Sequence, residues 1–401
     1  MPPIKFTSLV FVSLALSGCQ SDLATVADAA FRTPPGFPVA QPDTGRPTTP
    51  TTPTDPSTPP TVPSTPPVEN VDAKPDCDAD VQSKLKAPGT GPIALSCSLR
   101  LTSADVITHP LVFEGSAASG SVLDCGGGTL DVSAGGSRKE KTAIAVRSKK
   151  TGSGPWDAPS SVTIRNCKIK GFVRIYGLGE NANGAVMKAS SRNPDHTAFA
   201  QASAPKNVRL DNITFDAPDG IPFYVGPGVT NAALVNSKIN GRSTAVAVYL
   251  DAESANNTIS NNVFGISTEK RELIAIDGSA NNRITNNVFE HSDNGGIFAY
   301  RNCGEGGVIR HQKPQYNQII GNTFRYRSSF PVKPAVWLNS RNGSSSYCFT
   351  DPAYPFGSSA SNLDFAQNNV VRNNRLEGGS DSLIRNDDPT NDVGGNTATG
   401  G

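Results

Sequence analysis

Residues 256–264 read NNTISNNVF, and residues 281–289 repeat the phrase as NNRITNNVF, 25 residues later. Stronger copies follow at residues 317–324 (NQIIGNTF) and 368–376 (NNVVRNNRL). Weaker copies precede them at residues 162–169, 208–213 and 234–239. A repeat of this length, with short alternating strands and no helical pattern, is typical of a solenoid.

The composition of the repeat indicates how its turns pack. Short apolar bursts alternate with Asn, Gly, Ser and Asp, which tolerate left-handed backbone conformations at tight bends. One repeat cannot bury its own apolar face, whereas turns stacked roughly 4.8 Å apart pair each strand with its neighbours. A sandwich or a propeller would need hairpin turns about every 8–12 residues or repeats of roughly 40. The pattern therefore predicts an all-β fold, a right-handed parallel β-helix solenoid.

The recurring asparagines are a second prediction of this fold. Amide side chains that occupy one place in every turn can form a ladder of hydrogen bonds. We expect two such columns, Asn261/Asn286/Asn373 and Asn262/Asn287/Asn322/Asn374.

The first residues have the features of a secretory signal. A lysine precedes the apolar run Phe6–Leu16, which is too short to remain as a membrane span after processing. The stretch Leu16-Ser17-Gly18-Cys19 resembles a bacterial lipobox. This resemblance implies a signal peptide at residues 1–18, lipidation of Cys19, and attachment in the envelope of a Gram-negative bacterium, at the outer membrane or in the periplasm. Ordinary secretion with cleavage elsewhere is the alternative.

Residues 19–76 are predicted to be the lipidated N-terminus and a disordered linker. Between Thr33 and Pro75 the chain holds 14 of its 32 prolines, with Thr and Ser between them. Such a composition cannot form a packed core and favours extended polyproline II. At about 3.1 Å per residue, it could hold a domain on the order of 100 Å from its anchor. The segment is either a stalk that reaches large material or a plain spacer.

The ends of the solenoid are predicted from their patterns. We expect the β-helix domain at residues 77–395, with roughly ten to eleven coils. Because an exposed coil end is an open sheet edge, it must be covered. Val81 and Leu85, one helical turn apart within Asp78–Lys86, predict a short N-terminal capping helix. The chain from Asp392 is predicted to fray, with residues 396–401 as a disordered tail.

The seven cysteines are typical of an extracytoplasmic protein. Without the lipidated Cys19 an even six remain, and no C-x₂-C pair suggests a zinc site. Their order along the chain suggests the disulfides Cys77–Cys97, Cys125–Cys167 and Cys303–Cys348, one of the connectivities that six cysteines allow. The four histidines lack metal-ligand spacing.

The charge pattern indicates which kinds of binding partner to expect. The net charge is +1, and no Lys/Arg stripe with interleaved aromatics is present, so nucleic acid is not an expected partner. An anionic ligand would need a local basic patch. The only membrane contact we expect is through the lipid anchor, and a monomer is the expected state.

The candidate site lies where the repeat changes character, within residues 249–311 and the insertions that follow. Asp251 lies five residues before its Asn-Asn marker and Asp277 four, so both are expected at equivalent places on adjacent coils. Tyr300-Arg301 fills the same place one coil later, and Asn339 or Arg341 the next. Because strand side chains alternate, these polar groups should line the outer face in a row at about 4.8 Å spacing.

Two stacked carboxylates do not readily both ionise without a cation between them, which leaves three arrangements open. In the first, one carboxylate holds a proton and acts as a general acid. In the second a Ca²⁺ ion lies between them, and in the third Arg301 or Arg271 pairs with them. An acid and a base would hydrolyse a glycosidic bond, whereas a cation that neutralises a uronate would acidify its C5 proton, as in lyases and C5-epimerases. A solvated ion-paired face without function is the alternative.

Two insertions lie beside this row. Gly304–Gln315 and Asn342–Asp364 each lengthen a coil, and long loops on one side of a solenoid commonly form the binding face. The second insertion carries four aromatic residues, which could stack on sugar rings or pack back onto the coils: Tyr347, Phe349, Tyr354 and Phe356.

The Asn-x-Phe coil repeats resemble the right-handed β-helix superfamily, which includes pectate lyases, alginate and chondroitin lyases, mannuronan C5-epimerases, polygalacturonases and NosD-like repeats. The resemblance covers residues from about 95 to 390 and implies the fold rather than an activity. The Asp-Pro-His-Asp signature of mannuronan epimerases differs from Asn193-Pro194-Asp195-His196, and the polygalacturonase motifs are absent from the sequence. No catalytic residue is therefore carried over from these families.

We expect an envelope-anchored protein that acts on an acidic polysaccharide as a lyase or C5-epimerase. Arg301 or Arg271 would neutralise the uronate, Tyr300 or His311 would move protons, and Asp251 and Asp277 would bind Ca²⁺ or orient these groups. The alternatives are a glycoside hydrolase that uses the two aspartates, and a non-enzymatic glycan-binding module. Arg301→Ala is predicted to remove turnover without changing the melting temperature. The expected substrate-binding residues are Tyr249, Glu253, Arg271, Glu272, Asn302, Glu305, Arg310, Asn339 and Arg341.

Overall fold

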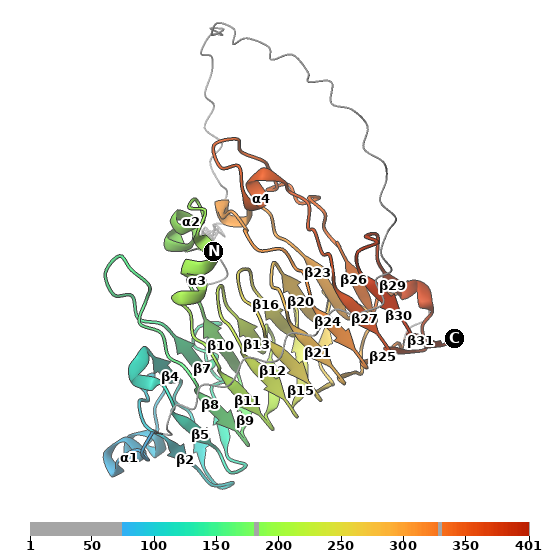
Figure 1. The fold of residues 1–401 in the computed structure, drawn as a ribbon. Helices are drawn as coiled ribbons and strands as arrows, with labels where there is room; N and C mark the ends of the chain where they lie inside the picture. The colour runs from blue at the N-terminus through green and yellow to red at the C-terminus, as the bar shows by residue number, and fades with distance from the viewer. Residues whose placement is uncertain (1–73, 180–183, 328–330, 401) are drawn as a thin grey trace, which may run out of the picture. The chain divides into compact units, whose positions relative to one another are not determined.

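The computed structural model describes residues 74–179, 184–327 and 331–400. In this part of the chain, three parallel sheets of ten, ten and eleven strands wind into a right-handed parallel β-helix (Figure 1). Each coil adds one strand to each sheet, as expected of a solenoid, and the third sheet has one extra strand, β19 (Ser267–Thr268), paired with β15 (Lys238–Ser243). The predicted fold class is confirmed. The predicted signal peptide, Cys19 and nearly all of the predicted linker lie outside the described residues.

The strands of each sheet follow one another in coil order. The first sheet contains β1 (Ile93–Ala94), β4 (Leu111–Glu114), β7 (Thr142–Arg147), β10 (Phe172–Tyr176), β13 (Phe223–Val225), β16 (Val248–Leu250), β20 (Ile274–Asp277), β23 (Ile297–Tyr300), β26 (Val336–Leu338) and β29 (Ile384–Arg385). The second contains β2 (Leu99–Arg100), β5 (Val122–Asp124), β8 (Thr163–Arg165), β11 (Arg209–Asp211), β14 (Ala233–Val235), β17 (Thr258–Ser260), β21 (Arg283–Thr285), β24 (Gln318–Ile320), β27 (Val370–Arg372) and β30 (Asp392–Gly394). The third contains β3 (Val106–Ile107), β6 (Thr129–Asp131), β9 (Lys168–Lys170), β12 (Thr214–Pro218), β15 (Lys238–Ser243), β18 (Val263–Phe264), β19 (Ser267–Thr268), β22 (Val288–Phe289), β25 (Thr323–Arg325), β28 (Arg375–Glu377) and β31 (Thr397–Thr399).

Short helices occur at the start of the solenoid and in its longer connections. They are α1 (Ala79–Lys86), α2 (Ala185–Ser190), α3 (His196–Ala202), α4 (Gly357–Ala360) and the 3₁₀ turns η1 (Ser116–Ala118), η2 (Glu305–Gly307) and η3 (Asp381–Leu383). The helix predicted over Asp78–Lys86 is confirmed as α1. Asp78 caps it by accepting a hydrogen bond from the Val81 amide, and Leu85 is buried in the core.

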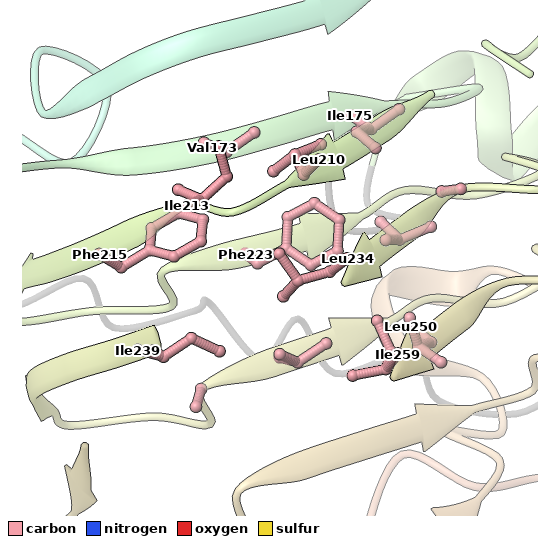
Figure 2. Packing of buried hydrophobic residues seen from close by; sticks show 14 of the residues in the cluster. Val173, Ile175, Leu210, Ile213, Phe215, Phe223, Leu234, Ile239, Leu250 and Ile259 are labelled. Carbon is pink, nitrogen blue, oxygen red and sulfur yellow. The ribbon is translucent and has the colours of Figure 1, made fainter. Parts of the chain in front are cut away.

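The core lies between the three sheets because alternate residues of each strand point inward. In β10, Val173 and Ile175 are fully buried while the residues between and after them are half-exposed (Figure 2). The phenylalanine of the repeated phrase stacks from coil to coil, with ring centroids 4.6 Å apart for Phe264 and Phe289 and 4.8 Å for Phe289 and Phe324. The recurring phenylalanine of the repeat thus forms one column of stacked rings in the core.

The two asparagines in the second pair of each repeated phrase, such as Asn261 and Asn262, have different roles. The second Asn of each pair is buried and forms the predicted ladder, in which Asn262, Asn287 and Asn322 each donate an Nδ2 hydrogen bond to the Asn Oδ1 of the next coil. The first Asn instead takes a positive φ, 57° at Asn261 and 56° at Asn286, and its side chain is exposed. The predicted ladder through Asn261, Asn286 and Asn373 is therefore wrong: in the described residues no hydrogen bond joins these side chains, because the left-handed bend turns them outward.

A further ladder was not predicted. It runs through Asn257, Asn282, Asn317, Asn369 and Asn391.

We expect Asn287→Ala to lower the free energy of unfolding by about 1–3 kcal/mol, because buried partners lose their hydrogen bonds. The Asn287 side chain accepts from the Asn262 amide at 3.0 Å and donates to the Ile259 carbonyl at 2.9 Å. Urea denaturation would measure the loss. Asn240→Ala, at an exposed position of β15, is the control and should change the stability little; equal effects of the two substitutions would contradict the role of the ladder.

The covalent cross-links and the C-terminal coil can be compared with their predictions. The disulfides Cys77–Cys97, Cys125–Cys167 and Cys303–Cys348 are all present, as predicted. Residues 392–399, predicted to fray, form β30 and β31 instead, because they pair with β27 and β28. Within the described ranges, no helix is both long and apolar enough to cross a membrane.

Three long connections follow strands of the first sheet, after β10, β23 and β26. We call their described parts, residues 184–207, 301–316 and 339–367, the insertion cluster. Hydrogen bonds join them: the Ile309 amide donates to Ser191 Oγ at 3.0 Å, and the Arg310 amide to Ser358 Oγ at 2.9 Å. The insertion cluster therefore packs together at the C-terminal ends of the first-sheet strands.

Candidate functional site

The structure brings the predicted polar row into register. Leu250 lies opposite Ile276, which places Asp251 beside Asp277, and Asp277 lies opposite Tyr300. The predicted exposure is wrong, however, because the insertion cluster covers the row. Asp251 and Asp277 are 1% and 0% exposed, and Tyr300 is equally buried.

Arg310 pairs with both aspartates and compensates their negative charge. Its Nη1 atom lies 2.7 Å from Asp251 Oδ1, and its Nη2 atom lies 3.5 Å from Asp277 Oδ2 and 3.3 Å from Glu305 Oε2. The Arg310 side chain is fully buried. Burial alone would lower the pKa of its guanidinium, but the two carboxylates raise that pKa well above the ordinary value. Of the three predicted arrangements, an arginine between the carboxylates is present, although it is Arg310 rather than Arg301 or Arg271.

Hydrogen bonds saturate both aspartates. The Tyr224 hydroxyl donates to Asp251 Oδ2 at 2.6 Å, and the Tyr249 hydroxyl to Asp277 Oδ2 at 2.6 Å. Asn302 donates to Asp277 through its backbone amide and its Nδ2 atom, both at 2.7 Å. These carboxylates therefore have no access to a glycosidic oxygen or a nucleophilic water. Among the described residues, no group of three or more His, Cys, Asp or Glu side chains is placed to hold a metal ion.

Arg301 is buried against the third segment of the insertion cluster, which corrects its predicted role. Its Nη2 atom donates to the backbone carbonyls of Ser361 and Leu363, each at 2.5 Å, and its side chain is buried. Asp364 accepts the Arg301 amide at 3.0 Å. Arg301 thus fixes the third segment of the insertion cluster. Arg301→Ala should destabilise the protein rather than remove turnover at an unchanged melting temperature.

Glu253 and His311 also join parts of the insertion cluster instead of facing a ligand. Glu253 is fully buried, and it accepts from Thr197 Oγ1 at 2.5 Å and from the His311 amide at 2.8 Å. The His311 Nε2 atom lies 2.8 Å from the Ser191 carbonyl. Asn339 similarly accepts the Ala366 amide at 2.7 Å. The structure therefore gives these three residues structural contacts.

The buried His196 should make the stability of the protein depend on pH. Burial lowers the pKa of this imidazole to about 4, against an ordinary value of 6.5, although Glu253 opposes the shift. Between these two values the unfolded chain binds a proton that the folded chain does not. We therefore expect the unfolding free energy to fall as pH drops from about 7 to about 4, with roughly 3 kcal/mol due to His196.

Urea denaturation at several pH values would measure this dependence. His196→Gln should flatten the curve relative to the wild type. A variant whose pH dependence matches that of the wild type would contradict the assignment to His196.

A second group of polar side chains remains on the outer face of the first sheet. Arg271 is 35% exposed, and its Nη2 atom lies 2.8 Å from Glu272 Oε1 and donates to the Tyr300 hydroxyl at 2.9 Å. The Arg341 guanidinium carbon lies 4.0 Å from the centroid of the Tyr300 ring. Ala275 packs in the same small cluster as Tyr300. Two arginines therefore flank one tyrosine.

Three further residues, Asn302, Tyr347 and Tyr249, lie around this group. Asn302 and Tyr347 both contact Arg341, the latter through its hydroxyl at 3.1 Å from Arg341 Nη1. Tyr249 is half-buried on the adjacent coil. Burial raises the pKa of Tyr300 well above its ordinary value, and Glu272 adds to that shift. Tyr300 is therefore a phenol that donates hydrogen bonds rather than a base.

One outward-facing position carries aromatic or basic side chains along most of the first sheet. Consecutive strands place these residues in register: Arg174, Tyr224, Tyr249, Ala275, Phe298, Trp337 and Arg385. The rings of Tyr224 and Tyr249 lie 6.0 Å apart, and those of Phe298 and Trp337 5.5 Å apart. Within this column Tyr249 and Trp337 are half-exposed, whereas Tyr224, Ala275 and Phe298 are buried, so only part of it offers ring faces to a ligand.

A basic cavity of about 240 Å³, not predicted from the sequence, lies at the early coils of this face. Arg138, Lys139 and Arg174 contribute three cations. The other lining residues are Thr142, Tyr176, Ile221 and Tyr224, so in the described part of the chain no carboxylate lines the cavity. The available signal was the run Arg138-Lys139 in a long connection beside strands with outward Arg and Tyr.

Comparisons with known proteins agree on the fold. Residues 156–326 match the protein-family model described as "Right handed beta helix region". This match agrees with the right-handed parallel β-helix of the structure, and the predicted resemblance to that superfamily is confirmed. No protein with a curated description matches the chain.

Several solved structures are similar over most of the chain. The surface protein and adhesin PfbA of Streptococcus pneumoniae is 13% identical, with 80% of each chain covered and a TM-score of 0.40. A family 28 exopolygalacturonase of Yersinia enterocolitica is 11% identical, with 74% of this chain and 68% of that one covered and a TM-score of 0.28. The DFA-IIIase of Arthrobacter chlorophenolicus A6 is also 11% identical, with 84% and 99% covered and a TM-score of 0.28. At these sequence identities and TM-scores, the similarities do not indicate an activity.

Proposed function

We propose that the protein acts on an acidic polysaccharide at the outer face of its first sheet, as a lyase or C5-epimerase anchored in the cell envelope. The observation that carries this proposal is the pair of arginines, Arg271 and Arg341, that flank Tyr300 beside the half-buried Tyr249. The anchor rests on the lipobox-like sequence at Cys19, which lies outside the described residues.

The proposed reaction depends on an arginine that pairs with the carboxylate of the sugar. A guanidinium that pairs with a uronate carboxylate stabilises the negative charge that develops when the C5–H bond breaks. The C5 proton passes to a solvent water molecule at this face, and the electron pair moves onto the carboxylate as an enolate. In a lyase the C4–O4 bond then breaks and its oxygen takes a proton, whereas in an epimerase a proton returns to C5 from the opposite face. Arg271 is the exposed cation best placed for this pairing.

The test is incubation of the full chain with alginate, polygalacturonate and a neutral glucan. Ultraviolet absorbance detects unsaturated uronates, a reducing-end assay detects cleavage, and NMR reports the C5 configuration. Unsaturated ends or inverted C5 centres from an acidic polymer would support the proposal. Reducing ends from the neutral glucan alone would overturn it.

A glycan-binding module without catalysis is the second candidate. The observation that favours it is the burial of Asp251, Asp277, Arg301 and Arg310, which leaves few of the predicted catalytic groups accessible. It predicts binding of an acidic polymer without any chemical change. A hydrolase that uses Asp251 and Asp277 is disfavoured because Arg310 and two tyrosines already occupy both carboxylates.

A further inference from the structure

We propose that the cavity lined by Arg138, Lys139 and Arg174 is a separate anion-binding subsite, and that the ligand is an extended polyanion running along the solenoid axis. This inference rests on the proposed function and adds to it a second contact point and a minimum ligand length. The shared chemistry recognised at the subsite is an anionic substituent on a sugar, a carboxylate or a sulfate.

The cavity is suited to an anion in charge and in shape. Its volume of about 240 Å³ exceeds that of a few water molecules. Arg174 is held in place, since its Nη1 atom donates to the Ile221 carbonyl at 2.6 Å and its Cζ atom lies 4.8 Å from the Phe172 ring centroid. A guanidinium held in this way loses little side-chain entropy when it binds an anion.

The other two cations approach from a different element. Arg138 and Lys139 lie on the connection between β6 and β7 and are exposed. Cations from a loop and from a strand therefore converge on one cavity, whose lining also includes the rings of Tyr176 and Tyr224. An anionic sugar needs both features, a charge partner for its substituent and an apolar face for its ring.

The position of the cavity sets the length of the ligand. Along the first sheet, β10 carries Arg174 and β23 carries Tyr300, and four strand-to-strand steps separate these strands. At about 4.8 Å per step, the distance is roughly 19 Å. Tyr249, which is half-buried, lies in the interval, and its ring is 6.0 Å from that of the buried Tyr224. A ligand that contacts both ends must therefore extend across the strands rather than along one of them.

Two linked contacts produce a specific binding behaviour. Once the polymer engages one subsite, its next charges are presented to the other at a high effective concentration. A long polyanion should therefore bind more tightly than a short oligomer of the same sugar. The gain should depend on the cavity cations and should weaken as salt screens them.

The experiment measures binding by the full chain to polygalacturonate, trigalacturonate, dextran sulfate and neutral dextran, at low and high salt. The test variant is Arg138→Ala/Lys139→Ala, both positions being exposed. The matched control is Lys168→Ala/Lys238→Ala, which removes the same charge from the exposed outer face of the third sheet. Thermal melting should show both variants folded.

We expect the test variant to bind the preferred polyanion about tenfold more weakly at low salt. Its affinity for trigalacturonate and the affinities of the control variant should not change. Preference for polygalacturonate over dextran sulfate would identify a carboxylate, and the reverse a sulfate; either supports the subsite.

Two results would overturn the inference in distinguishable ways. If the wild type binds a polyanion and the test variant binds it equally well, the subsite is wrong and the proposed function stands. If the wild type binds neither polyanion, the proposed function fails together with the subsite.

Discussion

Replacing Arg310 with Met is expected to lower the free energy of unfolding by about 3–5 kcal/mol, because it leaves buried carboxylates without their cation. Arg310 and Asp277 are 0% exposed and Asp251 is 1% exposed. The cation also comes from the insertion cluster, whereas Asp277 ends β20 and Asp251 directly follows β16. Loss of this link should loosen the insertion cluster from the coils. Urea denaturation of the full chain measures the effect.

Two further variants test the interpretation. Arg325→Met removes an arginine that is 41% exposed and paired with Glu290 and Glu377, so its cost should stay below about 1 kcal/mol. Adding Asp251→Asn and Asp277→Asn to Arg310→Met removes the uncompensated charges and should restore part of the lost stability. A loss of less than about 1 kcal/mol for Arg310→Met alone would show that the buried network does not stabilise the protein.

The fold could be predicted because one physical requirement repeats in the sequence. A stacked coil needs a left-handed bend and a buried amide at the same places in every turn, and Asn supplies both at Asn261 and Asn262. The requirement recurs 25 residues later at Asn286 and Asn287, so it is visible without any contact information. The register of Asp251 with Asp277 follows from the same repeat.

The candidate site could be predicted only in part, because the repeat does not describe the insertions. Arg310 lies 59 residues after Asp251 and reaches it from a connection without repeat character. Arg301 follows Tyr300, and its side chain contacts the third segment of the insertion cluster rather than the row. Burial of the row depends on long-range contacts such as the one between Glu253 and Thr197. Sequence spacing contains no information about these contacts.

The basic cavity illustrates the same limit in another way. Its cations come from Arg174 on a strand and from Arg138 and Lys139 in a connection. None of these residues belongs to the repeated phrase, and the net charge of +1 gives no hint that cations gather at one place. A local field can exist on a nearly neutral protein because charge is distributed unevenly over its surface.

Under the proposed chemistry, Arg271→Ala is expected to lower turnover of the acidic polysaccharide by about 100- to 1000-fold. The reason is that its guanidinium is the accessible cation beside Tyr300, 35% exposed, and removal of one group that stabilises a developing anion typically has an effect of this size. The kcat/KM on the identified polymer would measure the change. Arg271→Lys keeps the charge without the bidentate geometry, so it should retain an intermediate turnover.

Arg242→Ala provides the matched control for this prediction. Arg242 lies on β15, is 64% exposed and pairs with Glu269, so its removal takes away one exposed cation from another sheet. Its kcat/KM should stay within about twofold of the wild type, because an exposed ion pair contributes little and its charge is screened at this distance. Equal losses for Arg242→Ala and Arg271→Ala would point to a general effect of net charge on the encounter with a polyanion. Full activity of Arg271→Ala would instead remove this residue from the reaction and strengthen the view that the face only binds its glycan.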